Sequence, residues 1–254
     1  MKSAQPACET FELVAGIVAL PSGAAWMPAS RTLIVADAHL GYEDVVGGAL
    51  PLWSTSEIFA LLTLLARRLD AQEIVFLGDI VHAAQMSEGA ARVVGCGLEA
   101  LRAEARLTLI AGNHEGRTRG SAILGETVDA IERDGFLLVH GDRPSPLGTP
   151  TVIGHLHPSL RLAGGHTVPA FVGTPRLVVL PAMTPYSSGL DVCSDAFAGA
   201  VGLRGVDADD ADVVAACADR LFPFGRIGPL KDLLRQPTPV RRSPYRKRIL
   251  RPDR

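Results

Sequence analysis

Six of the seven histidines in this sequence fall in five short polar segments, each of which directly follows an apolar run. Imidazoles, carboxylates and carboxamides are the side chains that bind transition metals or move protons near neutral pH. Their recurrence in this context therefore indicates one shared chemical site. The five segments read Asp37-Ala-His39, Gly78-Asp79-Ile-Val-His82, Gly112-Asn113-His114-Glu115, His140-Gly-Asp142 and Gly154-His155-Leu-His157.

Strand geometry explains how separate segments can form one site. The loops that follow the carboxyl ends of neighbouring strands in an α/β sheet converge on one crevice. Residues two apart on an extended strand point to the same side. We therefore expect Asp37 with His39, and His155 with His157, to direct paired ligands to one place.

The ligand types indicate the metal. A mixture of carboxylate, imidazole and amide suits Mn²⁺, Fe or Zn²⁺ better than Ca²⁺, which prefers oxygen ligands. The set holds more ligands than one ion needs, and a carboxylate shared by two ions accounts for the excess, as in two-metal phosphoester hydrolysis. We expect two divalent ions, with Mn²⁺ as the first choice and Fe or Zn²⁺ as alternatives.

The elements that position these residues follow from the apolar periodicity. Strands alternate with helices in the first half and give way to strand-rich sequence, which predicts parallel strands with crossover helices joined to a second sheet. Ser54 and Glu57 have the spacing of a capping box at a helix start. Strands are expected over 31–37, 73–79, 106–113, 136–142, 150–155 and 176–182, a hairpin over 11–27, and helices over 54–70, 87–104, 121–134 and 205–221.

The composition is that of an ordinary folded protein, with 47% apolar and 20% charged residues. No window approaches eighteen uninterrupted apolar residues, so no transmembrane helix or membrane partner is expected, and the N-terminus lacks the apolar core of a secretory signal. The four cysteines lie far apart without a CxxC pair, which favours reduced thiols and a cytoplasmic location. Nothing in the sequence indicates an oligomeric state.

The charge is unevenly distributed. Residues 235–254 contain eight basic side chains and one acidic one, whereas the other residues are net acidic. This shift predicts a main domain over 1–234 and a basic, flexible tail over 235–254. The tail is either simply solvated or binds a nucleic-acid backbone. Likewise, Arg117 and Arg119 are either ordinary surface charges or contacts to a substrate phosphate.

The five motifs in this order resemble the calcineurin-like metallophosphoesterase superfamily, over residues 31–157. The resemblance implies a four-layer α/β/β/α sandwich of two mixed sheets flanked by helices. Two segments, GHLHP at 154–158 and LPAMTPYSSGLDV at 180–192, are similar to a smaller group, the bacterial ligase-associated DNA-damage-response metallophosphoesterases and their archaeal relatives.

The resemblance also implies a role for each polar residue. One metal would be held by Asp37, His39 and His157, the other by Asn113, His140 and His155, with Asp79 bridging the two. His114 would contact the scissile phosphate and protonate the leaving oxygen. His82 stands where protein phosphatases of the superfamily have Asp and is similar to the DNA-repair nucleases, which favours a phosphodiesterase. Glu115 and Asp142 would orient the histidines.

The expected function is that of a dinuclear-metal-dependent phosphodiesterase, a DNA nuclease that acts in DNA repair. The resemblance suggests a DNA ligase or helicase as partner. An alternative is a phosphodiesterase for small substrates such as cyclic nucleotides. A non-catalytic scaffold is a further alternative, but a scaffold would be expected to have lost some ligands, and this set is complete.

Overall fold

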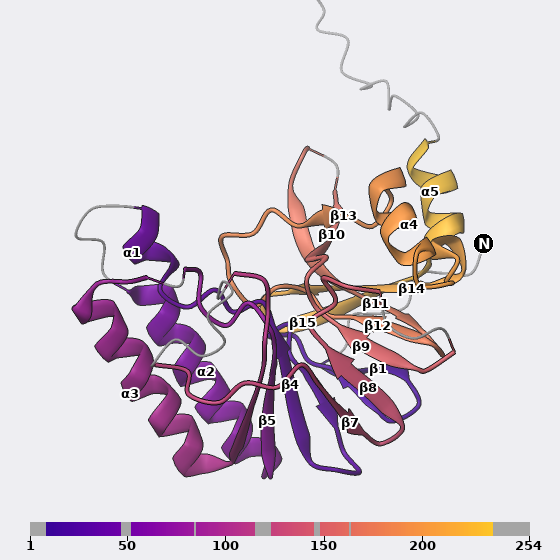
Figure 1. Ribbon diagram of the computed structural model, residues 1–254. Coiled ribbons are helices and arrows are strands. Elements are labelled where there is room, and N and C mark those ends of the chain that lie inside the picture. The colour runs from indigo at the N-terminus through magenta and orange to yellow at the C-terminus, as the bar shows by residue number, and fades with distance from the viewer. Residues whose placement is uncertain are drawn as a thin grey trace, which may run out of the picture.

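The computed structural model describes residues 9–46, 52–83, 85–114, 123–144, 148–162 and 164–235. Glu115, Arg117, Arg119 and nearly all of the predicted tail lie outside these ranges. Two β-sheets form the centre of the molecule, and helices lie on both outer faces (Figure 1).

The first sheet has six strands in chain order, of which the last three are parallel. Strands β4 and β5 are buried along their whole length, as their continuous apolar runs predict for strands covered on both faces. The hairpin expected over 11–27 is a three-stranded antiparallel meander. The strands are β1 (Phe11–Val14), β2 (Ile17–Ala19), β3 (Ala25–Met27), β4 (Thr32–Ala36), β5 (Glu73–Leu77) and β6 (Arg106–Ile110).

The second sheet is mixed and has the order β13-β10-β11-β12-β9-β8-β7, with β14 paired to β11 and β15 to β14. Strands β8, β9 and β12 run parallel to one another. The strands are β7 (Ala130–Arg133), β8 (Phe136–Val139), β9 (Thr151–Ile153), β10 (Pro158–Arg161), β11 (Thr167–Thr174), β12 (Leu177–Val179), β13 (Leu190–Asp191), β14 (Asp212–Cys217) and β15 (Arg220–Arg226).

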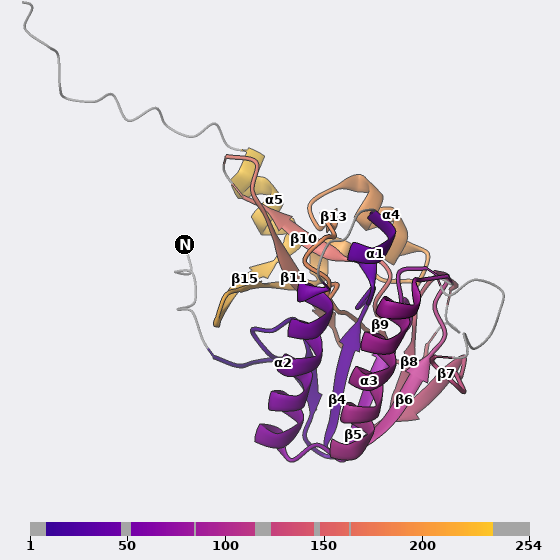
Figure 2. The same cartoon turned by 90° about the vertical axis from the view of Figure 1, so that its left-hand side faces the viewer.

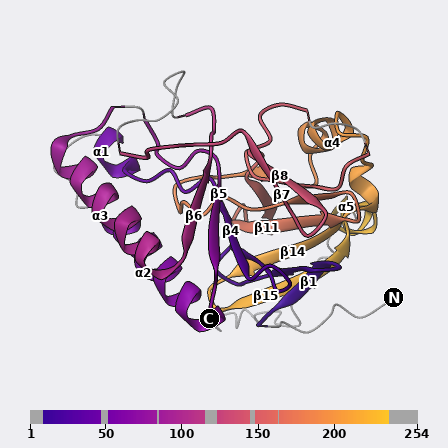
Figure 3. The ribbon, with the colours of Figure 1, turned by 60° about the horizontal axis from the view of Figure 1, so that its bottom comes forward.

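Helices cover the outer face of each sheet (Figures 2 and 3). The first sheet carries α2 (Trp53–Leu69) and α3 (Glu88–Glu104), with the short α1 (Tyr42–Val46) at one end. The second carries α4 (Asp195–Gly202), a 3₁₀ turn at Ala208–Asp210 and α5 (Ile227–Arg235). None of the helices in the described ranges has the length and apolar character needed to cross a membrane.

Three apolar cores separate these layers. The core under α2 and α3 contains Phe76 and Leu98. A second core between the two sheets contains Ile34 and Phe171, and a third, under α4 and α5, contains Phe197. The predicted four-layer α/β/β/α sandwich of two mixed sheets is thereby confirmed.

Two predicted helices are wrong. The segment 205–221 forms the 3₁₀ turn and the strand β14, because its apolar residues from Val213 to Ala216 are consecutive and buried, a pattern that fits a core strand. The segment 121–134 ends in strand β7 instead of a helix. Asp134 and Gly135 both have positive φ, so they form the tight turn to β8.

The predicted capping box of α2 is also absent. The helix begins at Trp53, and the side chain of Leu52 offers no cap. Instead, the buried carboxylate of Glu43 accepts hydrogen bonds from the backbone N–H of Ser54 and from the hydroxyls of Ser54 and Thr55. A carboxylate at this position also suits the positive end of the helix dipole.

Candidate metal centre

The predicted site residues come together where strands of the two sheets end side by side. Asp37 follows β4, Asp79 follows β5 and Asn113 follows β6, all in the first sheet. His140 follows β8, and His155 lies beyond β9, both in the second sheet. Since Gly154 N–H donates to His140 C=O at 3.0 Å, the two loops from the second sheet are themselves joined.

The first group of ligand atoms belongs to Asp37, His39, Asp79 and His157, and these atoms all lie within 4.8 Å of one another. His157 Nε2 is 3.3 Å from Asp37 Oδ1, and His39 Nε2 is 3.9 Å from Asp79 Oδ2. Two carboxylates and two imidazoles therefore face one point.

The second group contains Asp79, His140 and His155. His140 Nε2 lies 3.5 Å from Asp79 Oδ1 and 3.2 Å from His155 Nδ1. Asn113 Oδ1 is 2.9 Å from the same His140 nitrogen, so its amide joins this group. Asp79 thus belongs to both groups, which is the position required of a carboxylate shared by two ions.

The backbone at these residues differs from the extended geometry expected from the sequence. Five of the predicted ligands have left-handed backbone conformations, which are rare for residues other than glycine. Strand β4 ends at Ala36 and β9 at Ile153, so the paired ligands lie in the loops and not on extended strands. The residues are Asp37 (φ 51°), His39 (φ 44°), Asp79 (φ 44°), His155 (φ 61°) and His157 (φ 42°).

Hydrogen bonds to the carboxylates hold these loops. Asp79 Oδ1 accepts from the backbone N–H groups of Asn113 and His114, both at 2.9 Å. Asp37 Oδ2 accepts from the backbone N–H of His155 at 2.8 Å, which links the two sheets. In each case backbone N–H groups fix one oxygen of the carboxylate, and this orients the whole carboxylate towards the cluster.

Two glycines let the side chains approach. A Cβ atom on Gly78 would collide with the ring of His140, and one on Gly154 would collide with the carboxylate of Asp37. Gly78 also has a φ of +72°. Both glycines belong to the predicted motifs, and the packing gives the physical reason for their presence.

Two histidines have one ring nitrogen fixed by a neighbour. His140 Nδ1 is 2.9 Å from the carbonyl oxygen of Leu77, which can only accept, so Nδ1 carries a proton and the ring directs Nε2 into the cluster. His157 Nδ1 lies 2.6 Å from Ser187 Oγ, and this bond directs Nε2 towards Asp37. Ser187 was not among the predicted site residues. Its only signal in the sequence is its place in the segment 180–192.

The buried carboxylate oxygen and the neutral imidazoles of the cluster are features expected where cations bind. Asp37 Oδ1 is buried and accepts no hydrogen bond from the part of the chain that the structure describes, which is costly for a carboxylate unless a cation is present. Burial lowers the pKa of His39 to about 3 and also lowers the pKa of His155, so both are neutral ligands at pH 7. Burial alone would lower the pKa of His157, but the Asp37 carboxylate outweighs it and raises that pKa.

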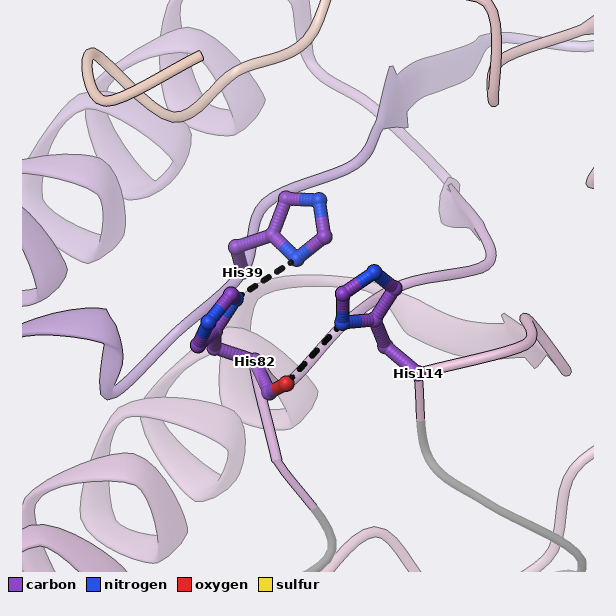
Figure 4. A group of neighbouring side chains, drawn as sticks. All are labelled: His39, His82 and His114. Carbon is purple, nitrogen blue, oxygen red and sulfur yellow. Dashed lines mark hydrogen bonds between the residues drawn. The ribbon is translucent and has the colours of Figure 1, made fainter. Parts of the chain in front are cut away.

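Three imidazoles lie together at one side of the cluster, with His39 buried, His82 partly buried and His114 exposed (Figure 4). His39 Nδ1 lies 3.4 Å from His82 Nδ1, and His114 Nδ1 lies 3.1 Å from the carbonyl oxygen of His82. That carbonyl can only accept, so His114 Nδ1 carries a proton and Nε2 is left for other partners. Burial lowers the pKa of His82, which favours its neutral form at pH 7. His82 and His114 are thus neighbours beside the candidate ligands.

Asp142 lies next to the cluster without a hydrogen bond to any described site histidine. Its carboxylate is 3.6 Å from Arg143 Nε, and it acts on His155 only through its charge. Its predicted role in orienting the histidines stays a prediction. The same holds for Glu115, Arg117 and Arg119, which lie outside the described residues.

The two sheets between helical layers, with a shared Asp and histidines at the strand tips, make the fold metallophosphoesterase-like. The chain matches the solved structure of the nuclease MPE from Pseudomonas putida with a TM-score of 0.65 and 25% sequence identity. The match covers 86% of this chain and 100% of that chain. No family model matches the chain, and none of the curated proteins does.

Proposed function

We propose that this protein is a dinuclear-metal-dependent phosphodiesterase that cleaves DNA, with Mn²⁺ as the preferred metal. The observation that carries the proposal is that two groups of buried ligand atoms share Asp79. The likeness to a bacterial nuclease supports phosphodiester bonds as the target. A role in DNA repair, with a ligase or helicase as partner, rests on the motif resemblance.

The ligand assignment follows the two groups. We assign Asp37, His39 and His157 to one ion, Asn113, His140 and His155 to the other, and Asp79 to both. When bound, two such ions polarise the phosphate and lower the pKa of water, which makes a nucleophile available at neutral pH. The protein's own part is to hold these ligands in rigid loops, so that no reorganisation is needed during the reaction.

His114 is the candidate proton donor to the leaving oxygen. The carbonyl of His82 fixes its Nδ1–H, so the ring presents Nε2, which lies 3.9 Å from Asp79 Oδ2, on the exposed side of the cluster. An imidazole placed in this way can donate a proton to a departing alkoxide. His82 lies beside His114, so we expect it to be close to the phosphate or the leaving group of a bound substrate.

A metal and substrate panel tests the proposal. The chelator-stripped protein is supplied with Mn²⁺, Fe²⁺ or Zn²⁺ and given bis-p-nitrophenyl phosphate, p-nitrophenyl phosphate, cyclic nucleotides, and single- and double-stranded DNA. We expect Mn²⁺-dependent cleavage of diesters, including DNA, in preference to the monoester. Absence of turnover with every metal would refute the enzyme, and turnover of cyclic nucleotides without DNA cleavage would establish the small-substrate alternative.

Removal of residues 236–254 tests the contribution of the basic tail. Loss of these cations should weaken DNA binding and flatten its dependence on salt, because fewer counterions are released. Hydrolysis of bis-p-nitrophenyl phosphate should be unaffected. Unchanged DNA cleavage and salt dependence would show that the tail does not bind DNA.

A further inference from the structure

The segment between β12 and β13 crosses from the second sheet to the first and passes beside the metal centre. Met183 N–H donates to Ala36 C=O at 2.9 Å, and Thr184 N–H donates to Asp37 C=O at 3.3 Å. These bonds anchor the segment at the tip of β4. Tyr186 and Ser187 follow immediately, so they are fixed next to the candidate ligands.

A cavity of about 340 Å³ opens between this segment and strands β10 and β11. Its wall includes His157, a candidate metal ligand, so the cavity begins at the metal centre. Among the described residues that line it, His157 is the only one with an ionisable group besides Tyr186, and no Asp, Glu, Lys or Arg is present. A volume of this size and a neutral lining suit a small uncharged group.

An aromatic ring forms one wall of the cavity. Tyr186 stacks on Tyr42 with ring centroids 4.5 Å apart and an interplanar angle of 14°, and Tyr42 in turn contacts His82 edge-on at 4.5 Å. Tyr186 is nevertheless 46% exposed and lines the cavity, although Tyr42 stacks on its ring. A rigid ring with an open face beside a phosphate-binding centre is suited to stack on a nucleobase.

A buried hydroxyl in the same cavity has no partner. Ser159 is 4% exposed, and its Oγ makes no hydrogen bond to any of the described residues. A buried polar group without a partner is unfavourable and calls for an explanation such as a missing ligand. Ser159 lines the cavity, and none of the described residues holds its hydroxyl by a hydrogen bond, so this hydroxyl is the candidate partner for a polar group of a bound molecule.

We propose that this cavity binds the nucleoside that adjoins the scissile phosphate, with the base stacked on Tyr186 and a sugar or base polar group bound by Ser159. The inference rests on the proposed phosphodiesterase function and names the part of the substrate that this surface recognises. Apolar contacts from Val168 and the prolines, together with hydroxyls, match the mixed character of a nucleoside.

Two diesters with the same leaving group test this site. Thymidine 5′-(p-nitrophenyl phosphate) carries a nucleoside, and methyl p-nitrophenyl phosphate does not. In Tyr186→Ala the ratio of their kcat/KM values should fall about ten- to a hundredfold, the worth of one base stack. Tyr186→Phe should keep the ratio, because the ring remains. Phe222→Ala, at an aromatic outside the cavity that is 39% exposed against 46% for Tyr186, is the matched control and should also keep it.

A second variant separates recognition from folding. Ser159→Ala removes a hydroxyl that has no partner in the free protein, so its melting temperature should not fall. Its KM for the thymidine diester should rise about three- to tenfold, the usual effect of one neutral hydrogen bond, and its kcat should change little. A lower melting temperature with an unchanged KM would show that Ser159 serves the fold alone.

Binding of free thymidine tests the site without catalysis. Saturation-transfer NMR should detect thymidine on the native protein and a weaker signal with Tyr186→Ala. Binding by a protein that hydrolyses neither diester would refute the proposed function and support the nucleoside site. Hydrolysis of both diesters with no selective loss in Tyr186→Ala, or no thymidine signal on the native protein, would overturn the nucleoside site. A comparison of kcat/KM for oligothymidylate and for cyclic nucleotides shows which kind of diester places its nucleoside in this cavity.

Discussion

Left-handed backbone conformations are concentrated at the candidate ligands. Each such residue costs on the order of 1–3 kcal/mol and persists only where the surroundings enforce it. Here the enforcing contacts are buried, for example the bond from His155 N–H to Asp37 Oδ2. Backbone strain at residues of metal-ligand type indicates a site whose geometry is set before a ligand binds.

Asp79 is the residue whose loss should matter most. Asp79→Asn preserves the size of the side chain and an oxygen that can accept from Asn113 and His114, so the fold should be retained. The charge shared between two ions is lost, so we expect bound Mn²⁺ to fall and turnover of bis-p-nitrophenyl phosphate to drop by about three decades or more. Elemental analysis and initial rates measure the two effects. Asp232→Asn on α5 is the control. Full Mn²⁺ content with native turnover in Asp79→Asn would contradict the shared-ligand assignment.

His114 should show its role through the leaving group. His114→Asn should retain both ions and lose about two to four decades in kcat on DNA, whose alkoxide leaving group needs a proton. On bis-p-nitrophenyl phosphate the loss should be much smaller, because nitrophenolate leaves without protonation. Equal losses on both substrates would argue against proton donation by His114.

Ser187 is predicted to position a metal ligand. Ser187→Ala removes the partner of His157 Nδ1, so the ring loses its fixed orientation, and the affinity for Mn²⁺ should fall about 10- to 100-fold. Calorimetric titration of the metal-free protein measures this change. The neighbouring Ser188→Ala is the matched control, and the prediction fails if both variants bind Mn²⁺ like the native protein.

At the scale of secondary structure, Glu73 joins the two sheets at the end of the strands opposite the metal centre. It is the first residue of β5 and is buried, and its carboxylate pairs with Arg133 of β7 and Arg106 of β6 and accepts from the Thr108 hydroxyl. Burial alone would raise the pKa of Glu73, but hydrogen bonds from Arg133, Thr108 and Arg106 outweigh it and lower that pKa.

Glu73→Gln should destabilise the fold by about 2–3 kcal/mol at pH 7, because two arginines lose their partner. A lowered folded-state pKa means that the charge of Glu73 stabilises the fold above the unfolded pKa of about 4.3 and that this is lost as the pH falls through the folded value. The difference in urea midpoint between native and variant protein should therefore shrink below about pH 4. A difference that is constant with pH would contradict the ionic role.

Features set by neighbouring residues in the chain were predictable from the sequence, whereas features set by contacts between distant segments were not. The motif residues and the strands 31–37, 73–79 and 106–113 were predictable because each apolar run is continuous and ends in its own polar segment. Strand β14 was not predictable, because an acidic stretch before valines and alanines also suits a helix. Its pairing with β11 is what makes this segment a strand. Glu43 and Ser187 were missed because their partners, Ser54 and His157, are distant in the chain.

At the scale of the whole molecule, the candidate metal centre is the junction of two sheets that otherwise meet through an apolar core. Asp37, Asp79 and Asn113 come from the first sheet, while His140 and His155 come from the second. The ions would therefore connect both halves of the sandwich, and metal binding and global stability should be linked.

This linkage predicts a stability change on metal removal. A ligand that binds only the folded state stabilises it by about 2.7 kcal/mol at a hundred times its Kd, so Mn²⁺ at that excess should raise the melting temperature above that of the EDTA-treated protein. In Asp79→Asn the Mn²⁺-induced rise should be mostly lost, whereas Asp232→Asn should keep it. If Mn²⁺ left the melting temperature of the native protein unchanged at a hundredfold excess over its Kd, the predicted linkage between metal binding and folding would be contradicted.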